Sequence, residues 1–139
     1  MCKWQVAAST LVQADIGSVW KIWSDVSAWN TWDSEVESSS LDGKFATGTT
    51  GKVKPKGWKE LPFTITLATK NARFITQSKM AFTTLTFDHT VTELPDGQLL
   101  ITHIAKASGL LAGLLFFTLR PQLKRCLPTS VAKIAKKAK

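Results

Sequence analysis

Apolar and polar residues alternate with a period of two over most of the chain, and this alternation predicts β-strands. The clearest case is residues 61–69, where Phe63, Ile65 and Leu67 share one face and threonines occupy the other. Successive side chains of an extended segment point to opposite faces, so each such segment offers one apolar face to a core. The predicted strands are residues 4–12, 35–41, 48–55, 61–69, 72–79, 82–93 and 99–107.

Two helical segments interrupt this alternation after the first strand. Apolar residues recur at spacings of three and four from Ile16 to Trp23, directly after Asp15, a residue type that is favoured at helix N-caps. A second short helix is predicted from Asp25 and carries Trp29. Two short helices joined this closely are expected to form a V.

The period changes again from Leu110 to the end of the chain, where leucines recur at steps of four and three and predict one long amphipathic helix. Pro121 and Pro128 fall inside it, and a proline within a helix removes a backbone hydrogen bond and clashes with the preceding turn. We therefore expect a kink or break near Arg120. The apolar stripe consists of Leu111, Leu115, Leu119, Leu123, Leu127, Val131 and Ile134.

Tryptophan is concentrated in residues 19–33, which hold four of the six tryptophans of the chain. Such large aromatic side chains stabilise most when buried, so the cluster marks an anchored interior or the wall of a hydrophobic ligand site. Trp20 and Trp23 fall on the apolar face of the first helix, which favours core packing. For Trp29, Trp32 and Trp58, in short helices or loops, both interpretations stay open.

Length and cysteine usage predict a single domain over residues 1–139 that needs neither a disulfide nor a metal to fold. Cys2 and Cys126 lie at opposite ends without metal-binding spacing, which is typical of reduced thiols in a cytoplasmic protein. The first ten residues lack the pattern of a signal peptide. The longest apolar block, residues 110–119, is about half of the roughly 20 residues that a membrane crossing requires.

The net charge of +8 arises entirely from residues 97–139, which carry eight basic side chains and no acidic one. Such an excess fits nucleic acid, an anionic membrane surface or a solvated helix face. The charges interleave with the leucine stripe, which favours the solvated face, and we expect no nucleic-acid partner. A transient contact with an anionic membrane is a secondary hypothesis, carried by Lys133, Lys136, Lys137 and Lys139 at about 1 kcal/mol each.

The order of one strand, two short helices, six strands and a long helix resembles the START-like (SRPBCC) superfamily, in its polyketide cyclase/dehydrase and lipid-transport branch. Two departures are Asn30, where the family often has proline, and the two prolines of the last helix. The resemblance covers nearly the whole chain and rests on Val19, Trp20, Ser24, Asp25, Val26, Trp29, Trp32, Asp33, Leu41, Asp42, Gly43, Phe45, Gly48, Thr49, Gly51, Phe87, His89, Asp96, Gly97, His103 and Gly109.

The resemblance implies an α+β helix-grip fold, in which a curved seven-stranded antiparallel sheet wraps around the C-terminal helix and leaves an elongated pocket between them. Members of the superfamily bind lipids, sterols, polyketides or plant hormones in that pocket, and some are enzymes. The fold alone therefore does not select an activity, and the residues of the pocket must do so.

His89 and His103, the two histidines, fall on the two arms of a hairpin that turns at residues 95–97, and they are expected to be cross-strand neighbours on one face. A metal would need a further ligand, and Asp88 should point to the other face. An acid–base role in the pocket and a structural role as hydrogen-bonded core residues both stay open, and the apolar surroundings favour the second. Glu35 and Glu37 share a face of a serine-rich strand that is typical of an exposed edge.

The sequence contains no recognisable catalytic triad or phosphate-binding loop, and we expect no cofactor and no metal. The favoured function is binding or carriage of a hydrophobic small molecule, such as a lipid, polyketide or aromatic compound. The alternatives are a cyclase or dehydratase that uses a pocket histidine on a polyketide-like substrate, and a protein-binding module; the oligomeric state stays open. The predicted ligand-binding residues are Trp29, Trp32, Trp58, Phe63, Ile65, Thr76, Leu85, Phe87, His89, Ile101, His103, Leu111, Leu114, Leu115 and Thr118.

Overall fold

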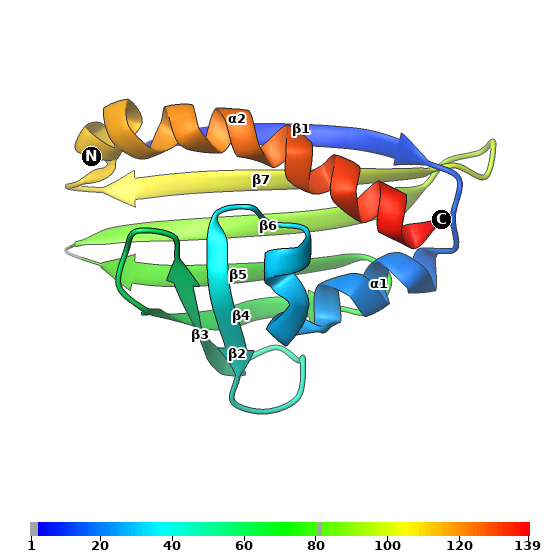
Figure 1. Cartoon of the computed structure of the whole chain (residues 1–139), viewed down its shortest axis with the longest axis horizontal. Helices are drawn as coiled ribbons and strands as arrows, with labels where there is room; N and C mark the ends of the chain where they lie inside the picture. The colour runs from blue at the N-terminus through cyan, green and yellow to red at the C-terminus, as the bar shows by residue number, and fades with distance from the viewer. Residues whose placement is uncertain (1–2, 81) are drawn as a thin grey trace.

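One antiparallel sheet curves around a long helix in the computed structural model, which describes residues 3–80 and 82–139 (Figure 1). This is the predicted α+β helix-grip fold. The elements follow the predicted order: β1 (Lys3–Val12), α1 (Ile16–Ser24), the short 3-10 helix η1 (Val26–Thr31), β2 (Val36–Leu41), β3 (Thr50–Pro55), β4 (Leu61–Thr69), β5 (Arg73–Met80), β6 (Thr83–Glu93), β7 (Leu99–Gly109) and α2 (Ala112–Ala138).

The seven strands form a single sheet with the order β1-β7-β6-β5-β4-β3-β2. Strands from β2 to β7 pair with their neighbours in sequence, as hairpins do, whereas β1 pairs with β7 at the far edge. The segment that contains α1 and η1 therefore carries the chain from one edge of the sheet to the other (Figure 1). This crossing places the tryptophan-rich helices beneath the sheet, beside the C-terminal half of α2.

Helix α2 packs across β1 and β7 and buries the second half of its predicted stripe, namely Leu123, Leu127, Val131 and Ile134. The main core lies between the end of α2, α1 and the sheet, and its largest fully buried side chains include Trp23 and Phe74. The first half of the stripe is only half-buried. The space between sheet and helix is thus densely packed near the C-terminus of α2, and the remaining space lies nearer its middle.

Of the kink or break predicted near Arg120, the break does not occur, because α2 is continuous from Ala112 to Ala138. Both prolines are exposed, so their rings face solvent rather than the sheet. The carbonyls that lose a donor belong to residues four positions earlier, Phe117 and Lys124, which are exposed as well, so water can satisfy them. Burial on the sheet side then holds the helix together. Figure 1 shows the C-terminal half of α2 sloping toward α1.

Among the helices of residues 3–80 and 82–139, none combines the length and the apolar character needed to span a membrane.

Candidate ligand-binding cavity

A cavity of about 160 Å³ lies between the middle of the sheet and the middle of α2. An apolar cavity of about 150 Å³ can stay dry and bind benzene, so the space fits a single aromatic ring or a short acyl chain. Drug-sized ligands occupy about 300 Å³ or more. The wall comprises Trp29, Trp32, Asp33, Glu35, Val36, Val53, Pro55, Leu61, Phe63, Thr76, Ser78, Leu85, Phe87, His89, His103, Ile104, Leu119, Gln122, Leu123, Cys126, Leu127 and Ser130.

The sheet side of the wall follows from strand alternation. Phe87 and Leu85 share one face of β6, and the register pairs Phe87 with Thr76 and Leu85 with Ser78 of β5. Two large apolar side chains thus stand beside two small hydroxyl side chains. Small residues opposite a helix leave space that larger ones would fill, and this pairing accounts for part of the void.

His89 and His103 lie directly opposite each other on β6 and β7, as the hairpin predicts, with ring centroids 4.5 Å apart. Nδ1 of His89 lies 3.3 Å from the carbonyl oxygen of Phe74, so this nitrogen carries the proton. The indole N–H of Trp23 donates to Nε2 of His103 over 3.3 Å, so this ring accepts there and must be neutral. Asp88 points to the other face, where its carboxylate pairs with both Nε and a terminal nitrogen of Arg73.

Burial governs the charge of both histidines. Desolvation lowers the pKa of His89 from 6.5 to about 4. The pKa of His103 is lowered well below its ordinary value, by burial first and by its neighbour His89 second. Both rings are therefore uncharged at pH 7 and form an apolar-like part of the wall where the cavity meets the core.

Trp29 and Trp32 serve both of the roles that the sequence leaves open. The ring of Trp29 stacks on Phe63 with centroids 5.4 Å apart, and its indole N–H donates to the carbonyl of Trp23 over 2.8 Å. Trp32 packs edge-on against His103, with centroids 5.6 Å apart. Both side chains are buried in the core and also form part of the cavity wall. Trp58 is 55% exposed in the turn between β3 and β4 and lies outside the cavity.

A cluster of four residues, Asp33, Glu35, Gln122 and Cys126, forms one side of the cavity, and we call it the polar rim. The side-chain amide of Gln122 donates to the carboxylate of Glu35 and so links the start of β2 to α2. Burial raises the pKa of Asp33, and the backbone N–H of Glu35 donates to this carboxylate over 3.0 Å. Burial, with the nearby negative charges of Asp33 and Glu35, raises the pKa of the Cys126 thiol to about 12.

This cluster sets what chemistry the cavity offers. The thiol stays protonated at pH 7, which makes Cys126 a poor nucleophile. Asp33, whose pKa burial raises, is the carboxyl group of the wall best placed to take part in proton transfer. This cluster was not predicted from the sequence, because the serine-rich strand that holds Glu35 was expected to be an exposed edge. Glu37 is indeed exposed and pairs with Lys54, but β2 begins only at Val36, so Glu35 lies before the strand and turns toward α2.

Eight of the predicted ligand-binding residues line the cavity and seven lie elsewhere. Ile65 and Ile101 are fully buried in the adjoining core, Leu111 and Leu115 are half-buried at the start of α2, and Trp58, Leu114 and Thr118 are exposed. The cavity faces later turns of α2, from Leu119 to Ser130. The residues that line it are Trp29, Trp32, Phe63, Thr76, Leu85, Phe87, His89 and His103.

One signal in the sequence could have located the helix side of the cavity. Gln122, Cys126 and Ser130 recur every four residues beside the leucine stripe, so they share one edge of the buried face of α2. Small or polar residues at this spacing leave room that a continuous leucine face would fill.

A curved sheet that closes on a long helix, with a cavity between them, defines the helix-grip fold. The family described as polyketide cyclase/dehydrase and lipid transport matches residues 3–138, and the chain belongs to this family. The chain has no match among curated protein sequences.

Solved structures with the same fold include three of very different sequence. An aromatase/cyclase of a Streptomyces species shares 8% identity, with a TM-score of 0.81 over 99% of this chain and 94% of that one. A hypothetical protein of Helicobacter pylori shares 13%, with a TM-score of 0.82 over 97% and 88% of the two chains. Truncated norcoclaurine synthase of Thalictrum flavum shares 10%, with a TM-score of 0.71 over 97% and 92%. At such low identity, these similarities show the fold alone.

Proposed function

We propose that the protein binds a hydrophobic small molecule in the cavity between the sheet and α2. The observation that carries this proposal is a void of about 160 Å³ with a mostly apolar wall. Protein interiors are otherwise close-packed, and a void costs stability because its wall lacks contacts on one side. A ligand that fills the void restores those contacts, which is the physical reason to expect one.

The size of the cavity bounds the affinity of a ligand confined to it. Burial of about 150 Å² of apolar ligand surface contributes roughly 4 kcal/mol, which corresponds to a dissociation constant of about 1 mM. A ligand that binds more tightly must bury more apolar surface and must therefore extend beyond the cavity. The bond between Glu35 and Gln122 joins the two sides of the polar rim, and a longer ligand would separate this pair.

The ligand class that fits best is a single-ring aromatic compound, or a larger polyketide or lipid whose ring or chain end enters the cavity. The family description names polyketides and lipids, and the Streptomyces structure is an aromatase/cyclase, which support these classes. A cytoplasmic location remains an expectation from the sequence.

A second candidate function, acid–base catalysis on a polyketide-like substrate, is favoured by the polar rim. Asp33 lines the cavity and has a raised pKa, whereas both histidines of the wall are neutral and hydrogen-bonded to neighbouring groups. If the protein is a cyclase or dehydratase, Asp33→Asn abolishes turnover and leaves ligand affinity within a factor of about three. If a pocket histidine carries the reaction, His89→Gln has that effect instead.

Titration calorimetry with toluene and indole tests the binding proposal, with tryptophan fluorescence as a second readout because Trp29 and Trp32 line the cavity. The decisive pair of variants is Cys126→Phe, which fills the cavity from α2, and Cys126→Ser, which keeps it open. We expect one bound molecule per chain in the wild type and in Cys126→Ser, and at least a tenfold loss in Cys126→Phe. Equal affinity in the two variants would mean that binding occurs elsewhere.

A further inference from the structure

A cluster of exposed apolar side chains occupies the end of the molecule where α2 begins. We call it the apolar tip, and it consists of Phe82, Leu110, Leu114, Phe116 and Phe117. Phe82 is 88% exposed, Phe117 77% and Leu110 73%. Within residues 3–80 and 82–139, seven large hydrophobic side chains are exposed, and these five are among them. Exposed apolar side chains that gather in this way mark an interaction surface, whereas single ones need no explanation.

Hydrogen bonds hold the parts of the apolar tip together. The backbone N–H of Leu110 donates to the carbonyl of Phe82 over 3.2 Å, and so joins the junction of β7 and α2 to the turn between β5 and β6. The next residue, Leu111, donates its N–H to the hydroxyl of Thr83 over 2.8 Å. The rings of Phe116 and Phe117 lie 5.3 Å apart on the first turns of α2. The turn that carries Phe82 and the start of α2 that carries Leu114, Phe116 and Phe117 are thus held together at the junction of β7 and α2.

The backbone of the tip is held in conformations that most residues avoid. Phe82 has φ = 60°, in the left-handed region that is costly for a bulky side chain. Its exposed ring gains little packing within the chain in return. Gly109 has φ = 116°, and a Cβ there would lie 2.2 Å from the Phe82 carbonyl oxygen, so only glycine allows this approach. Strain that projects an aromatic ring into solvent is typical of a functional surface.

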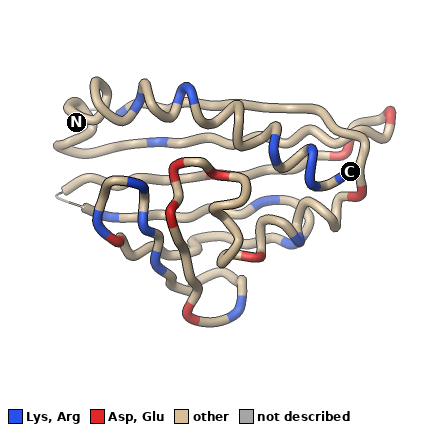
Figure 2. Tube along the Cα trace, viewed as in Figure 1, with Lys and Arg blue, Asp and Glu red and all other residues tan. Residues whose placement is uncertain are grey.

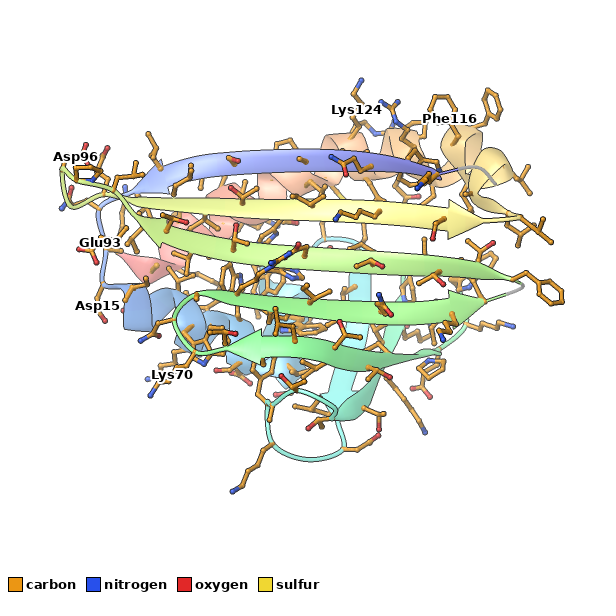
Figure 3. The ribbon with its side chains drawn as sticks, turned by 180° about the vertical axis from the view of Figure 1, so that it is seen from behind. Asp15, Lys70, Glu93, Asp96, Phe116 and Lys124 are labelled. Carbon is orange, nitrogen blue, oxygen red and sulfur yellow. The ribbon has the colours of Figure 1, made fainter. Side chains whose placement is uncertain are left out.

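Basic side chains adjoin the apolar tip. The guanidinium carbon of Arg120 lies 4.8 Å from the centre of the Phe116 ring, and exposed Lys124 and Arg125 follow on the next turn. Figure 2 shows α2 with basic residues and no acidic ones. In Figure 3, Phe116 lies toward one end of the molecule and Lys124 nearer its middle, whereas the labelled acids Asp15, Glu93 and Asp96 lie toward the opposite end, as does Lys70. The apolar tip therefore adjoins a basic stretch of α2.

We propose that the apolar tip docks on anionic lipid bilayers, with Leu114 and Phe117 inserted among the acyl chains and Arg120 and Lys124 at the headgroups. Aromatic and leucine side chains beside Lys and Arg are the composition of helices that lie in a membrane interface. The charged side chains of α2 that follow the tip, Arg120, Lys124 and Arg125, are all basic, and such side chains attract the phosphate headgroups of anionic lipids.

This surface differs from the membrane contact expected from the sequence. Lys133, Lys136 and Lys137 are exposed, but the apolar residues between them are buried against the core, so that end of α2 offers charge without side chains to insert. The apolar tip offers both. Along α2, Leu115 and Leu119 follow the tip and pack against the same small core cluster, and Leu119 also lines the cavity. Docking itself does not depend on the proposed ligand binding.

Vesicle sedimentation tests the docking with full-length protein and two lipid mixtures, phosphatidylcholine alone and phosphatidylcholine with one-third phosphatidylglycerol. We expect wild type to bind only the anionic vesicles and high salt to release it. The double variant Leu114→Ser/Phe117→Ser should weaken binding at least tenfold. Arg120→Gln/Lys124→Gln should weaken it and flatten its salt dependence. Trp58→Ser, which removes an exposed aromatic side chain outside the tip, should bind like wild type.

Three results would overturn the proposal. Unchanged vesicle binding by Leu114→Ser/Phe117→Ser would exclude insertion, and loss only in Lys136→Gln/Lys137→Gln would move the contact to the other end of α2. If wild type ignores vesicles but forms a dimer that the tip variant abolishes, the surface binds a second copy instead. None of the substituted side chains is buried in the core, so circular dichroism should show each variant folded. Toluene titration of the same samples tests the cavity independently.

Discussion

The buried histidine pair predicts that acid destabilises the fold before most carboxylates are protonated. In the unfolded chain His89 titrates near 6.5, whereas burial lowers its pKa to about 4 in the folded protein. Between these values the unfolded state binds the proton and the folded state does not, so stability falls as the pH falls. The effect is absent above about pH 7 and complete below about pH 4.

The size of the effect follows from the same two pKa values. Each pH unit between them corresponds to about 1.4 kcal/mol. The interval from 6.5 to about 4 therefore makes acidification cost roughly 3 kcal/mol through His89 alone. His103, whose pKa is also lowered well below its ordinary value, acts in the same direction. Asp33 opposes them, because its raised pKa means that the folded state binds this proton more readily than the unfolded state.

Urea unfolding followed by tryptophan fluorescence at pH 7, 6 and 5 measures this slope. The matched variant is His89→Asn, whose amide can still donate to the Phe74 carbonyl but does not titrate. We expect wild type to lose about 0.7 kcal/mol more than the variant between pH 7 and 6, and about 1.2 kcal/mol more between pH 6 and 5, where the pH lies between the two pKa values of His89. Asp33 is present in both proteins, so its contribution cancels. Parallel curves for the two proteins would show that His89 is not buried in its neutral form.

Three further predictions concern stability, each measured by urea unfolding at pH 7. Trp29→Phe should lower the free energy of unfolding by about 1–2 kcal/mol more than Trp32→Phe does. The indole N–H of Trp29 donates to a backbone carbonyl, whereas that of Trp32 has no partner among the described residues. Equal losses in the two variants would contradict this reasoning. Arg73→Met should lower the free energy of unfolding by about 1–2 kcal/mol, because it leaves the Asp88 carboxylate, only 4% exposed, without its cation. The partial exposure of the guanidinium limits the loss. An unchanged free energy of unfolding would show that the pair does not stabilise the fold. Gly109→Ala should cost more than 2 kcal/mol, because its positive φ and the close backbone contact both exclude a Cβ, and a stable Gly109→Ala protein would mean that this junction can rearrange.

The sequence was sufficient to predict the fold because the sheet has one buried face and the helices have one buried stripe. The alternation around Phe63 and Ile65 located β4, and the turn at residues 95–97 set a register that places His89 opposite His103. The prediction of a kink or break near Arg120 left both outcomes open, and the chain does not break there because both prolines face solvent.

The position of the cavity could be predicted only in part. A leucine stripe identifies the buried face of a helix but not which of its turns meets a void, and so Leu114 and Thr118 were assigned to the wall while Leu123 and Leu127 were not. The polar rim was missed for a related reason. Glu35 becomes part of this partly buried cluster only because Gln122, 87 residues away in sequence, donates a hydrogen bond to it.

The central claim is that an apolar cavity between the sheet and α2 holds a small hydrophobic molecule. The most direct test is the structure of a crystal of the protein soaked with iodobenzene. The anomalous signal of iodine locates the ring without prior assumptions about its site. The account predicts one strong peak between Phe87 of β6 and Leu123 of α2, which is lost in Cys126→Phe crystals. A space filled by the protein's own side chains, or iodine found only at the apolar tip, would contradict it.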